Sequence, residues 1–381
     1  MAAGAARGRR REAGLYLHLP FCATRCSYCT FVTSTELGAM PRTLAAAERE
    51  VGRIGRRVRQ RLATVYLGGG TPSLVPEERL AAVIAAVRRS FATDAVQEFT
   101  LEANPDDVRP DRLAAWRSLG VTRVSLGVQS FDDRVLHLLG RRHDAAAASR
   151  SVRLALDARL AVSLDLMLGL PGMTRSQLEA TLAEVLRLRP HHVSVYLLEM
   201  DKPHALVQLA QRQPHLFPDA DAAAAQYLAT GRALVAAGYR HYEISNFALP
   251  GCEARHNLRY WLGLPVLAAG VAAHGQAGLA RWANHADLNA YLEAVENDRP
   301  AHAWARRLGP DEALRERVML GLRLARGVAS ADLDACAELA PAFGVALADF
   351  LALGLARRRG ERVRCTPRGW LVSNELLSAL W

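Results

Sequence analysis

Leu19-Pro20-Phe21-Cys22-Ala23-Thr24-Arg25-Cys26-Ser27-Tyr28-Cys29 is the most informative segment of this chain of 381 residues. Its cysteines have the spacing C-x3-C-x2-C, and an aromatic residue precedes the last of them. A cubane [4Fe–4S] cluster normally takes four thiolates, one for each iron. Three local thiolates would hold three irons and leave the fourth open to a chelating ligand. The spacing therefore favours a cluster bound by Cys22, Cys26 and Cys29.

Two other roles for these thiols have to be weighed. A structural zinc site could use the three cysteines with His18 as the fourth ligand. Zinc sites usually pair short C-x2-C units across a longer loop, and no second unit follows here. A disulfide framework is less favoured, because the chain is long and shows no secretory signal.

Composition predicts a folded protein that lies in a reducing compartment. Half of the residues are hydrophobic, so a large core can form, and the length suits two or three domains. No apolar run approaches the ~20 residues of a membrane span, so we do not expect an integral membrane protein. Six cysteines and a cluster that needs reducing conditions favour the cytoplasm.

The formal net charge of +10 favours anionic partners such as carboxylates and phosphates. No segment interleaves basic and aromatic residues, so nothing points to nucleic acid. The N-terminal residues 1–13 are small and Arg-rich, and we predict a disordered arm there.

Strands alternate with helices from residue 14 to residue 245, which predicts parallel βα units. The expected strands are Leu15–Leu19, Thr64–Leu67, Glu98–Glu102, Arg123–Gly127, Ala161–Met167, His192–Leu197 and Tyr242–Ser245. Six or seven such units predict an α/β fold, a partial (β/α) TIM-like barrel with its site at the carboxyl ends of the strands. Thr174 and Gln177 fit a capping box that opens a helix ending near Arg189-Pro190.

The remaining chain differs in pattern. Residues 246–309 look irregular and are rich in His, Trp, Tyr and Gly. Residues 310–381 are mostly helical, and Arg362–Cys365 with Trp370 suggests a small hairpin beside the helices. We expect a winged-helix-like module at this end.

Unusual residues recur where the predicted strands end. The glycines Gly68-Gly69-Gly70 follow the second strand, and their N–H groups could bind an anion, although a tight turn explains them equally well. Glu102 ends the third strand and could accept from an ammonium or a ribose hydroxyl, although an ordinary loop charge is the simpler explanation. Gln129 follows the fourth strand and Asp165 lies in the fifth. Together these residues predict a polar site at one edge of the sheet.

These segments and several others resemble one family, the radical S-adenosylmethionine (radical SAM) proteins. Within it the chain looks like relatives of oxygen-independent coproporphyrinogen III oxidase (HemN-like), and most of all like the HemW haem chaperones. The resemblance runs from about Leu15 to the C-terminus. The segments that carry it are Tyr16-Leu17-His18-Leu19-Pro20-Phe21-Cys22, Gly68-Gly69-Gly70-Thr71-Pro72-Ser73, Leu101-Glu102-Ala103-Asn104-Pro105, Ser125-Leu126-Gly127-Val128-Gln129-Ser130-Phe131, Gly140-Arg141-Arg142-His143, Asp165-Leu166-Met167-Leu168-Gly169-Leu170-Pro171-Gly172, Tyr242-Glu243-Ile244-Ser245-Asn246-Phe247-Ala248 and His256-Asn257-Leu258-Arg259-Tyr260-Trp261.

The resemblance implies roles for particular residues. Cys22, Cys26 and Cys29 would bind the cluster. Tyr16, Gly69 and Glu102 would contact the SAM bound to it. The positions that in the oxidase surround a second SAM are Tyr28, Gly70, Thr71, Gln129, Arg141 and Asp165. Whether one or two SAM molecules bind stays open.

Three departures separate the possible activities. Phe31 stands where the oxidase carries a further cysteine, which argues against decarboxylation of coproporphyrinogen. The segment with His256, Tyr260 and Trp261 is typical of the chaperones, because His can ligate haem iron and aromatic rings can stack on the macrocycle. The segment 268–275 is poorer in glycine than in relatives, which weakens the expectation of backbone contacts to SAM there. Cys252 could also contact haem, although an idle thiol explains it better.

The leading hypothesis is a cytoplasmic haem chaperone that carries the cluster and SAM and passes haem to an unidentified acceptor, which could be membrane-associated. On this hypothesis residues 246–309 contact haem. The alternative is an oxygen-independent coproporphyrinogen III oxidase of porphyrin biosynthesis, and a zinc-stabilised binding module is a distant third. Whether the chain is an enzyme stays open.

Overall fold

The computed structural model describes residues 12–58 and 60–381. The predicted arm over residues 1–13 lies outside this part, apart from its last two residues, which begin the first strand. No helix in the described ranges is long and apolar enough to cross a membrane.

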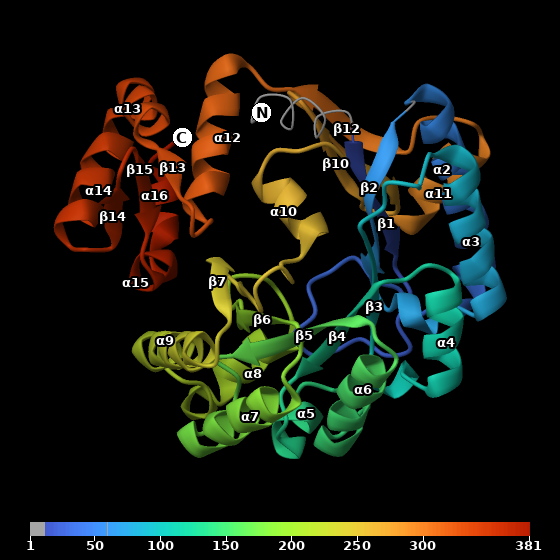
Figure 1. Cartoon of the computed structure of the whole chain (residues 1–381), viewed down its shortest axis with the longest axis horizontal. Coiled ribbons are helices and arrows are strands. Elements are labelled where there is room, and N and C mark those ends of the chain that lie inside the picture. The colour runs from blue at the N-terminus through green and yellow to red at the C-terminus, as the bar shows by residue number, and fades with distance from the viewer. Residues whose placement is uncertain (1–11, 59) are drawn as a thin grey trace.

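Strands and helices alternate through most of the chain (Figure 1). The strands are β1 (Glu12–Leu19), β2 (Arg61–Gly69), β3 (Glu98–Ala103), β4 (Arg123–Gln129), β5 (Ala161–Leu168), β6 (His192–Leu197), β7 (Arg240–Glu243), β8 (Asn246–Ala248), β9 (Val266–Gly270), β10 (His274–Ala277), β11 (Ala280–Asn284), β12 (His302–Arg307), β13 (Val328–Ala329), β14 (Ala356–Arg359) and β15 (Arg362–Cys365). The α-helices are α2 (Met40–Arg57), α3 (Glu77–Ser90), α4 (Pro110–Ser118), α5 (Asp133–Leu138), α6 (Ala145–Asp157), α7 (Arg175–Leu188), α8 (Ala205–Arg212), α9 (Ala220–Ala236), α10 (Arg255–Trp261), α11 (Leu288–Glu296), α12 (Pro310–Leu322), α13 (Ser330–Leu339), α14 (Pro341–Ala352), α15 (Pro367–Leu371) and α16 (Ser373–Ser378).

The predicted partial barrel is confirmed. Strands β1 to β6 are adjacent in sequence order and all parallel. Their inward and outward side chains are mostly buried, as expected of parallel strands that are covered by helices. The capping box of Thr174 and Gln177 is also confirmed: it opens α7, which ends at Arg189 in a left-handed conformation.

Both edges of the barrel sheet are extended by further strands, and of these only β7 overlaps a strand that the sequence predicted. The predicted seventh strand Tyr242–Ser245 ends instead at Glu243, and β7 and β8 form an antiparallel hairpin beside β6. At the other edge β9 pairs in parallel with β1, and β10, β11 and β12 follow it as an antiparallel meander. Residues 246–309, which look irregular in the sequence, therefore contribute β8 to β12 to one 12-stranded sheet of the described chain.

The C-terminal part is mostly helical, as predicted, and has its own core. Helices α12 to α16 surround a three-stranded sheet with the order β13-β15-β14, which includes the expected hairpin. Its buried cluster includes Phe343, Trp370 and Leu376. The indole N–H of Trp370 donates to the carbonyl of Leu322 at 2.9 Å. In Figure 1 these helices lie at one side, and α10 lies between α12 and strands β1 and β2.

One buried carboxylate fastens the added strands to the barrel. Glu50 of α2 accepts from the backbone N–H of Gly270 at 2.8 Å, the hydroxyl of Tyr291 at 2.9 Å and the amide of Asn284 at 2.7 Å. Burial raises the pKa of Glu50, and these three hydrogen bonds oppose that rise. The side chain thus joins α2 to β9, β11 and α11.

We expect Glu50→Ala to lower the free energy of unfolding by roughly 2–4 kcal/mol, because three buried donors lose their acceptor. Urea unfolding followed by circular dichroism measures the change. Glu48→Ala on the same helix is the control, since Glu48 is partly exposed, and should cost less than about 0.5 kcal/mol. Equal unfolding midpoints for the two variants would show that Glu50 does not hold these elements together.

Candidate functional site

A cavity of about 400 Å³ opens at the carboxyl ends of the parallel strands, where the sequence predicts the site. It is lined by nearly all of the residues that the sequence singles out for the cluster and SAM, namely Cys22, Cys26, Tyr28, Cys29, Gly69, Gly70, Thr71, Glu102, Gln129, Arg141 and Asp165. Tyr16 is the exception. The fold therefore gathers into one concave surface residues that are spread over 144 positions of the sequence.

The cysteine loop is braced at its base and along its length. Cys22 donates its N–H to the carbonyl of Ser34 at 2.9 Å, and Ser34 donates back to Pro20 at 2.7 Å. Farther along, Ser27 donates through its N–H to Leu139 at 3.2 Å. These bonds fix the path of a segment that contains no helix or strand of its own.

Hydrogen-bond donors lie beside two of the thiols. The hydroxyl of Thr71 lies 3.5 Å from Cys22 Sγ, and the Arg141 guanidinium lies 3.3 Å from Cys26 Sγ. Burial raises the pKa of Cys22 and of Cys29. In the described part of the chain, no three His, Cys, Asp or Glu side chains converge on one metal ion. The loop thus presents three separate thiols along one cavity wall, with a cation and a hydroxyl that would stabilise thiolates.

The glycine segment serves the cysteine loop and does not offer its N–H groups to a ligand. Gly70 donates to Leu19 at 2.8 Å and Thr71 donates to Phe21 at 2.8 Å. A Cβ on Gly70 would lie 2.6 Å from the Pro20 carbonyl carbon, so no side chain fits between the two loops. Of the two explanations that the sequence left open, these contacts fit the tight turn, because protein groups already accept from the N–H groups of Gly69, Gly70 and Thr71.

Glu102 is held in place inside the barrel. Its carboxylate accepts from the hydroxyl of Tyr66 at 2.6 Å and from the N–H of Gly69 at 3.0 Å, while burial raises its pKa. Tyr16 lies behind this pair: its ring is 5.9 Å from the ring of Tyr66, and its hydroxyl contacts His18 Nδ1 at 3.0 Å. Tyr66 is thus the tyrosine that faces the cavity, and Tyr16 supports it.

Arg141 and Gln129 also line the cavity. Arg141 donates to Asn104 Oδ1 at 2.7 Å and to the carbonyl of Gly127 at 2.6 Å. Gln129 has a φ of 71° at an irregularity in β4, a geometry that redirects side chains beside functional sites. Among the described residues, Arg141 Nε and Gln129 Oε1 are buried without a hydrogen-bond partner. One donor and one acceptor are therefore available to a bound molecule.

A carboxyl from the middle of β5 also lines the cavity. Burial raises the pKa of Asp165 to about 7, and nearby Glu102 adds to the rise while a hydrogen bond from Ser194 opposes it. At neutral pH this group is poised between its two protonation states.

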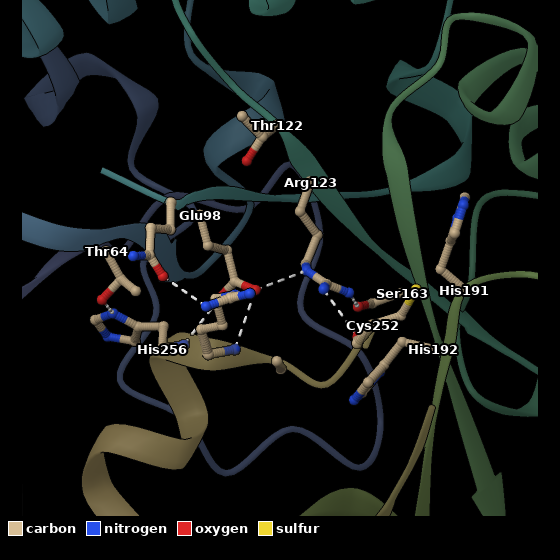
Figure 2. A network of polar contacts seen from close by, with 12 residues as sticks. Thr64, Glu98, Thr122, Arg123, Ser163, His191, His192, Cys252 and His256 are labelled. Carbon is tan, nitrogen blue, oxygen red and sulfur yellow. Dashed lines mark hydrogen bonds and ion pairs between the residues drawn. The ribbon is translucent and has the colours of Figure 1, made fainter. Parts of the chain in front are cut away.

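A polar network closes the far end of the barrel (Figure 2). Glu98 and Arg123 form a buried ion pair at 3.1 Å. Arg123 also donates to Ser163 at 3.1 Å and to the carbonyl of Cys252 at 2.9 Å. Glu98 accepts the N–H of His256 at 2.9 Å. Every charge is thus partnered, and the pair holds the chain that leads into α10 against the strands.

Two of the three haem candidates lie side by side: the rings of His256 and Tyr260 are 5.7 Å apart in an edge-to-face arrangement. His256 is 1% exposed. Its Nδ1 forms a hydrogen bond of 2.9 Å with the hydroxyl of Thr64, and its ring lies 5.1 Å from the ring of Tyr66. Tyr260 also lines a different, smaller groove. Trp261 lies 5.9 Å beneath the Arg323 guanidinium. In this conformation the His256 ring is not accessible to a haem iron, and haem contact by these residues stays a prediction.

Several residues of the site were not identified from the sequence. Asn104 and Tyr66 orient Arg141 and Glu102, and Glu98 with Arg123 closes the floor. Asn104 and Tyr66 each lie close to a strand end and so carried a positional signal. The Glu98–Arg123 pair carried none, because charged residues at the start of a strand are usually exposed.

Comparison with known proteins places these features in a family context. A model of the radical SAM superfamily matches residues 16–185, and a model of the HemN C-terminal domain matches residues 308–372. The heme chaperone HemW of Mycobacterium tuberculosis (strain H37Rv) is 38% identical over 373 residues, which cover 96% of this chain and 94% of that protein. HemW of Bacillus subtilis is 32% identical and the alignment covers 96% of this chain and 98% of that protein. Radical S-adenosyl methionine domain-containing protein 1, mitochondrial, of Mus musculus is 35% identical. The alignment covers 97% of this chain and 87% of that protein.

Among solved structures, coproporphyrinogen III oxidase (HemN) from Escherichia coli superposes with a TM-score of 0.85. The match covers 99% of this chain and 92% of that chain, at 23% identity. This likeness confirms the fold, including the mostly helical C-terminal part.

Asp165 provides a test of the cavity's electrostatics in the chain without cluster or SAM. The folded-state pKa of about 7 lies above the unfolded value, so the native state binds more protons between pH 4 and 7 and the free energy of unfolding falls as pH rises through this window. Asp165→Asn should remove this loss, on the order of 2 kcal/mol between pH 5 and pH 8. Urea unfolding at both pH values measures it.

Asp157→Asn is the matched control, because Asp157 is exposed at the end of α6, and it should leave the pH dependence unchanged. An Asp165→Asn variant with the wild-type pH dependence would contradict the raised pKa.

Proposed function

The chain belongs to the radical SAM family, and within it to the group of heme chaperones named HemW, so we propose that it binds haem and delivers it to an acceptor protein. The observation that carries this proposal is similarity over 96% of the chain to a protein of that name. Phe31 supports it, because the family's oxidases carry a further cysteine at this position and Phe31 is an exposed apolar side chain.

Cys22, Cys26 and Cys29 are the proposed ligands of a [4Fe–4S] cluster. All three lie on one wall of the cavity, on a braced loop, with donors from Thr71 and Arg141 beside them. These donors favour the thiolate state that iron requires. The other cysteines lie elsewhere, and none of the six forms a disulfide. A reducing compartment such as the cytoplasm suits such a site.

SAM is the proposed occupant of the cavity next to the cluster. Bound there, SAM would supply a sulfonium whose S–C bond an electron from the cluster could break. Glu102 is oriented by Tyr66 and Gly69 to accept from the ammonium or a ribose hydroxyl. Arg141 and Gln129 have a buried donor and a buried acceptor to spare. Tyr16 would act on SAM only by supporting Tyr66.

Gly70, Thr71, Tyr28 and Asp165 complete the cavity wall. Gly70 and Thr71 have their N–H groups committed to the cysteine loop, so we propose that they shape the cavity and that the Thr71 side chain acts on Cys22. Asp165 is the proposed acceptor for a second cationic group in the cavity, once it is ionised.

Cys26→Ser should prevent incorporation of the cluster while leaving the chain folded, because one of three iron ligands is lost. Anaerobic reconstitution with iron and sulfide, followed by absorbance near 400 nm and iron analysis, measures this. Cys252→Ser should reconstitute like the wild type, since this partly buried thiol lies outside the loop. A Cys26→Ser protein with the full iron content would contradict the assignment.

The reconstituted full chain should bind haemin in a saturable way and shift its Soret band. It should also fail to form protoporphyrinogen when incubated anaerobically with coproporphyrinogen III, SAM and a reductant. Haemin titration and product analysis by chromatography measure the two outcomes. Non-saturable haemin absorbance would remove the chaperone proposal, and product formation would establish the oxidase alternative.

A further inference from the structure

A second groove lies on the face of the sheet extension, outside the cavity of the cysteine loop. It has a volume of about 250 Å³ and is formed by the added strands together with α10 and α12. Its lining includes Tyr260, His274, Arg281, Trp304, Arg306 and Met319. The role inferred for this groove rests on the proposed haem-chaperone function and identifies where haem would bind.

The strand register places its floor residues on one face. His274 pairs with Ala283, which pairs with Trp304, and residues paired across antiparallel strands project to the same side. Arg281 and Arg306 pair in the same way, two residues from Ala283 and from Trp304 respectively, and share that face. The rings of His274 and Trp304 lie 6.0 Å apart in an edge-to-face arrangement. An imidazole, an indole and two guanidinium groups therefore occupy one surface.

Two helices form the walls of this groove. Tyr260 of α10 points its hydroxyl toward the His274 carbonyl, at 3.4 Å. Met319 and Leu320 of α12 follow Glu316 at helical spacing, so the three lie on one face of that helix and all line the groove. The thioether of Met319 thus belongs to a wall, and the imidazole of His274 to the floor, of the same groove.

These groups match the chemistry of haem. The His274 ring is exposed and has no hydrogen-bond partner among the described residues, so a nitrogen can ligate iron. Trp304 is 44% exposed and Tyr260 lines the same groove, so the groove offers aromatic surface to a porphyrin face. A sulfur ligand in addition to imidazole is a known haem coordination, and Met319 could supply it.

The charges suit the two propionates. Arg306 contacts Glu312 at 3.3 Å, but both side chains are more than 40% exposed, and such a surface pair is weak enough to be exchanged for a propionate. Arg281 is held by the Glu316 carboxylate, so it is less available. Arg306 is therefore the cation that would pair with one propionate. The negative charge of Glu316 limits where the second propionate can lie.

The contrast with His256 strengthens this assignment. His256 is 1% exposed and bonded to Thr64, and its backbone is fixed by Glu98, so α10 would have to leave the barrel before iron could reach the ring. No such rearrangement is needed at His274. We propose that haem binds in the groove between α10, α12 and β10–β12, with His274 as an iron ligand and Tyr260, Trp304 and Arg306 in contact with the macrocycle.

The test is a haemin titration of the full-length chain, followed by absorption and electron paramagnetic resonance spectra. His274→Ala should raise the dissociation constant about tenfold or more and change the axial-ligand spectrum. Trp304→Ala should weaken binding about threefold or more without changing the ligand signature. The control His215→Ala removes an exposed histidine distant in sequence from the groove and should leave both readings unchanged. His256→Ala is titrated in parallel.

Each outcome decides one question. If the wild type binds no haemin saturably, the proposed function fails. If the wild type binds but His274→Ala keeps its affinity and spectrum, the groove assignment is overturned while the function stands. If the haem spectrum changes in His256→Ala and not in His274→Ala, the iron ligand is on α10 and the chain binds haem in an opened conformation. Far-UV circular dichroism of each variant checks that binding is lost without loss of fold.

Discussion

The close contact between the glycine turn and the cysteine loop is the constraint on which the cavity depends. Gly70 and Thr71 donate to the carbonyls of Leu19 and Phe21, and a Cβ at Gly70 would collide with Pro20. Two strand ends are thereby locked at a separation that only glycine permits. Because the same turn includes Gly69, which donates to Glu102, the path of the cysteine loop and the orientation of the carboxylate are set together.

The two ends of the barrel use charge differently. At the open end, Arg141 and Gln129 keep buried polar atoms without partners, which costs stability unless a bound molecule supplies them. At the closed end, Glu98 and Arg123 are fully paired and also bind the backbone that leads into α10. A satisfied buried pair rigidifies this floor, and it keeps His256 inside the core. The polar atoms that are available to a ligand and the ion pair that closes the barrel thus lie at different ends of the barrel.

The sheet extension gives the molecule a second functional surface beside the first. Strand β9 pairs with β1, so the strand that leads into the cysteine loop is also the anchor for β10 to β12. His274 begins β10 close enough to His18 that the two charges would oppose each other. Burial chiefly lowers the pKa of His18, its backbone hydrogen bond opposes that change, and the charge of His274 adds to it. The strands of the proposed haem groove and the strand that leads into the cluster loop therefore belong to one sheet, with β9 between them.

The position of the cysteine loop at the cavity, the order of the parallel βα units and the cap of α7 could be predicted from the sequence. Each depends on residues that are neighbours along the chain. The strand-end positions of Gly69, Glu102 and Gln129 followed from the same local periodicity. Only the tertiary structure showed that Tyr66 and not Tyr16 faces the cavity, that Glu98 pairs with Arg123, and that residues 246–309 join the barrel sheet. These features depend on register and packing between segments far apart in the chain, which short-range patterns of hydrophobicity do not encode.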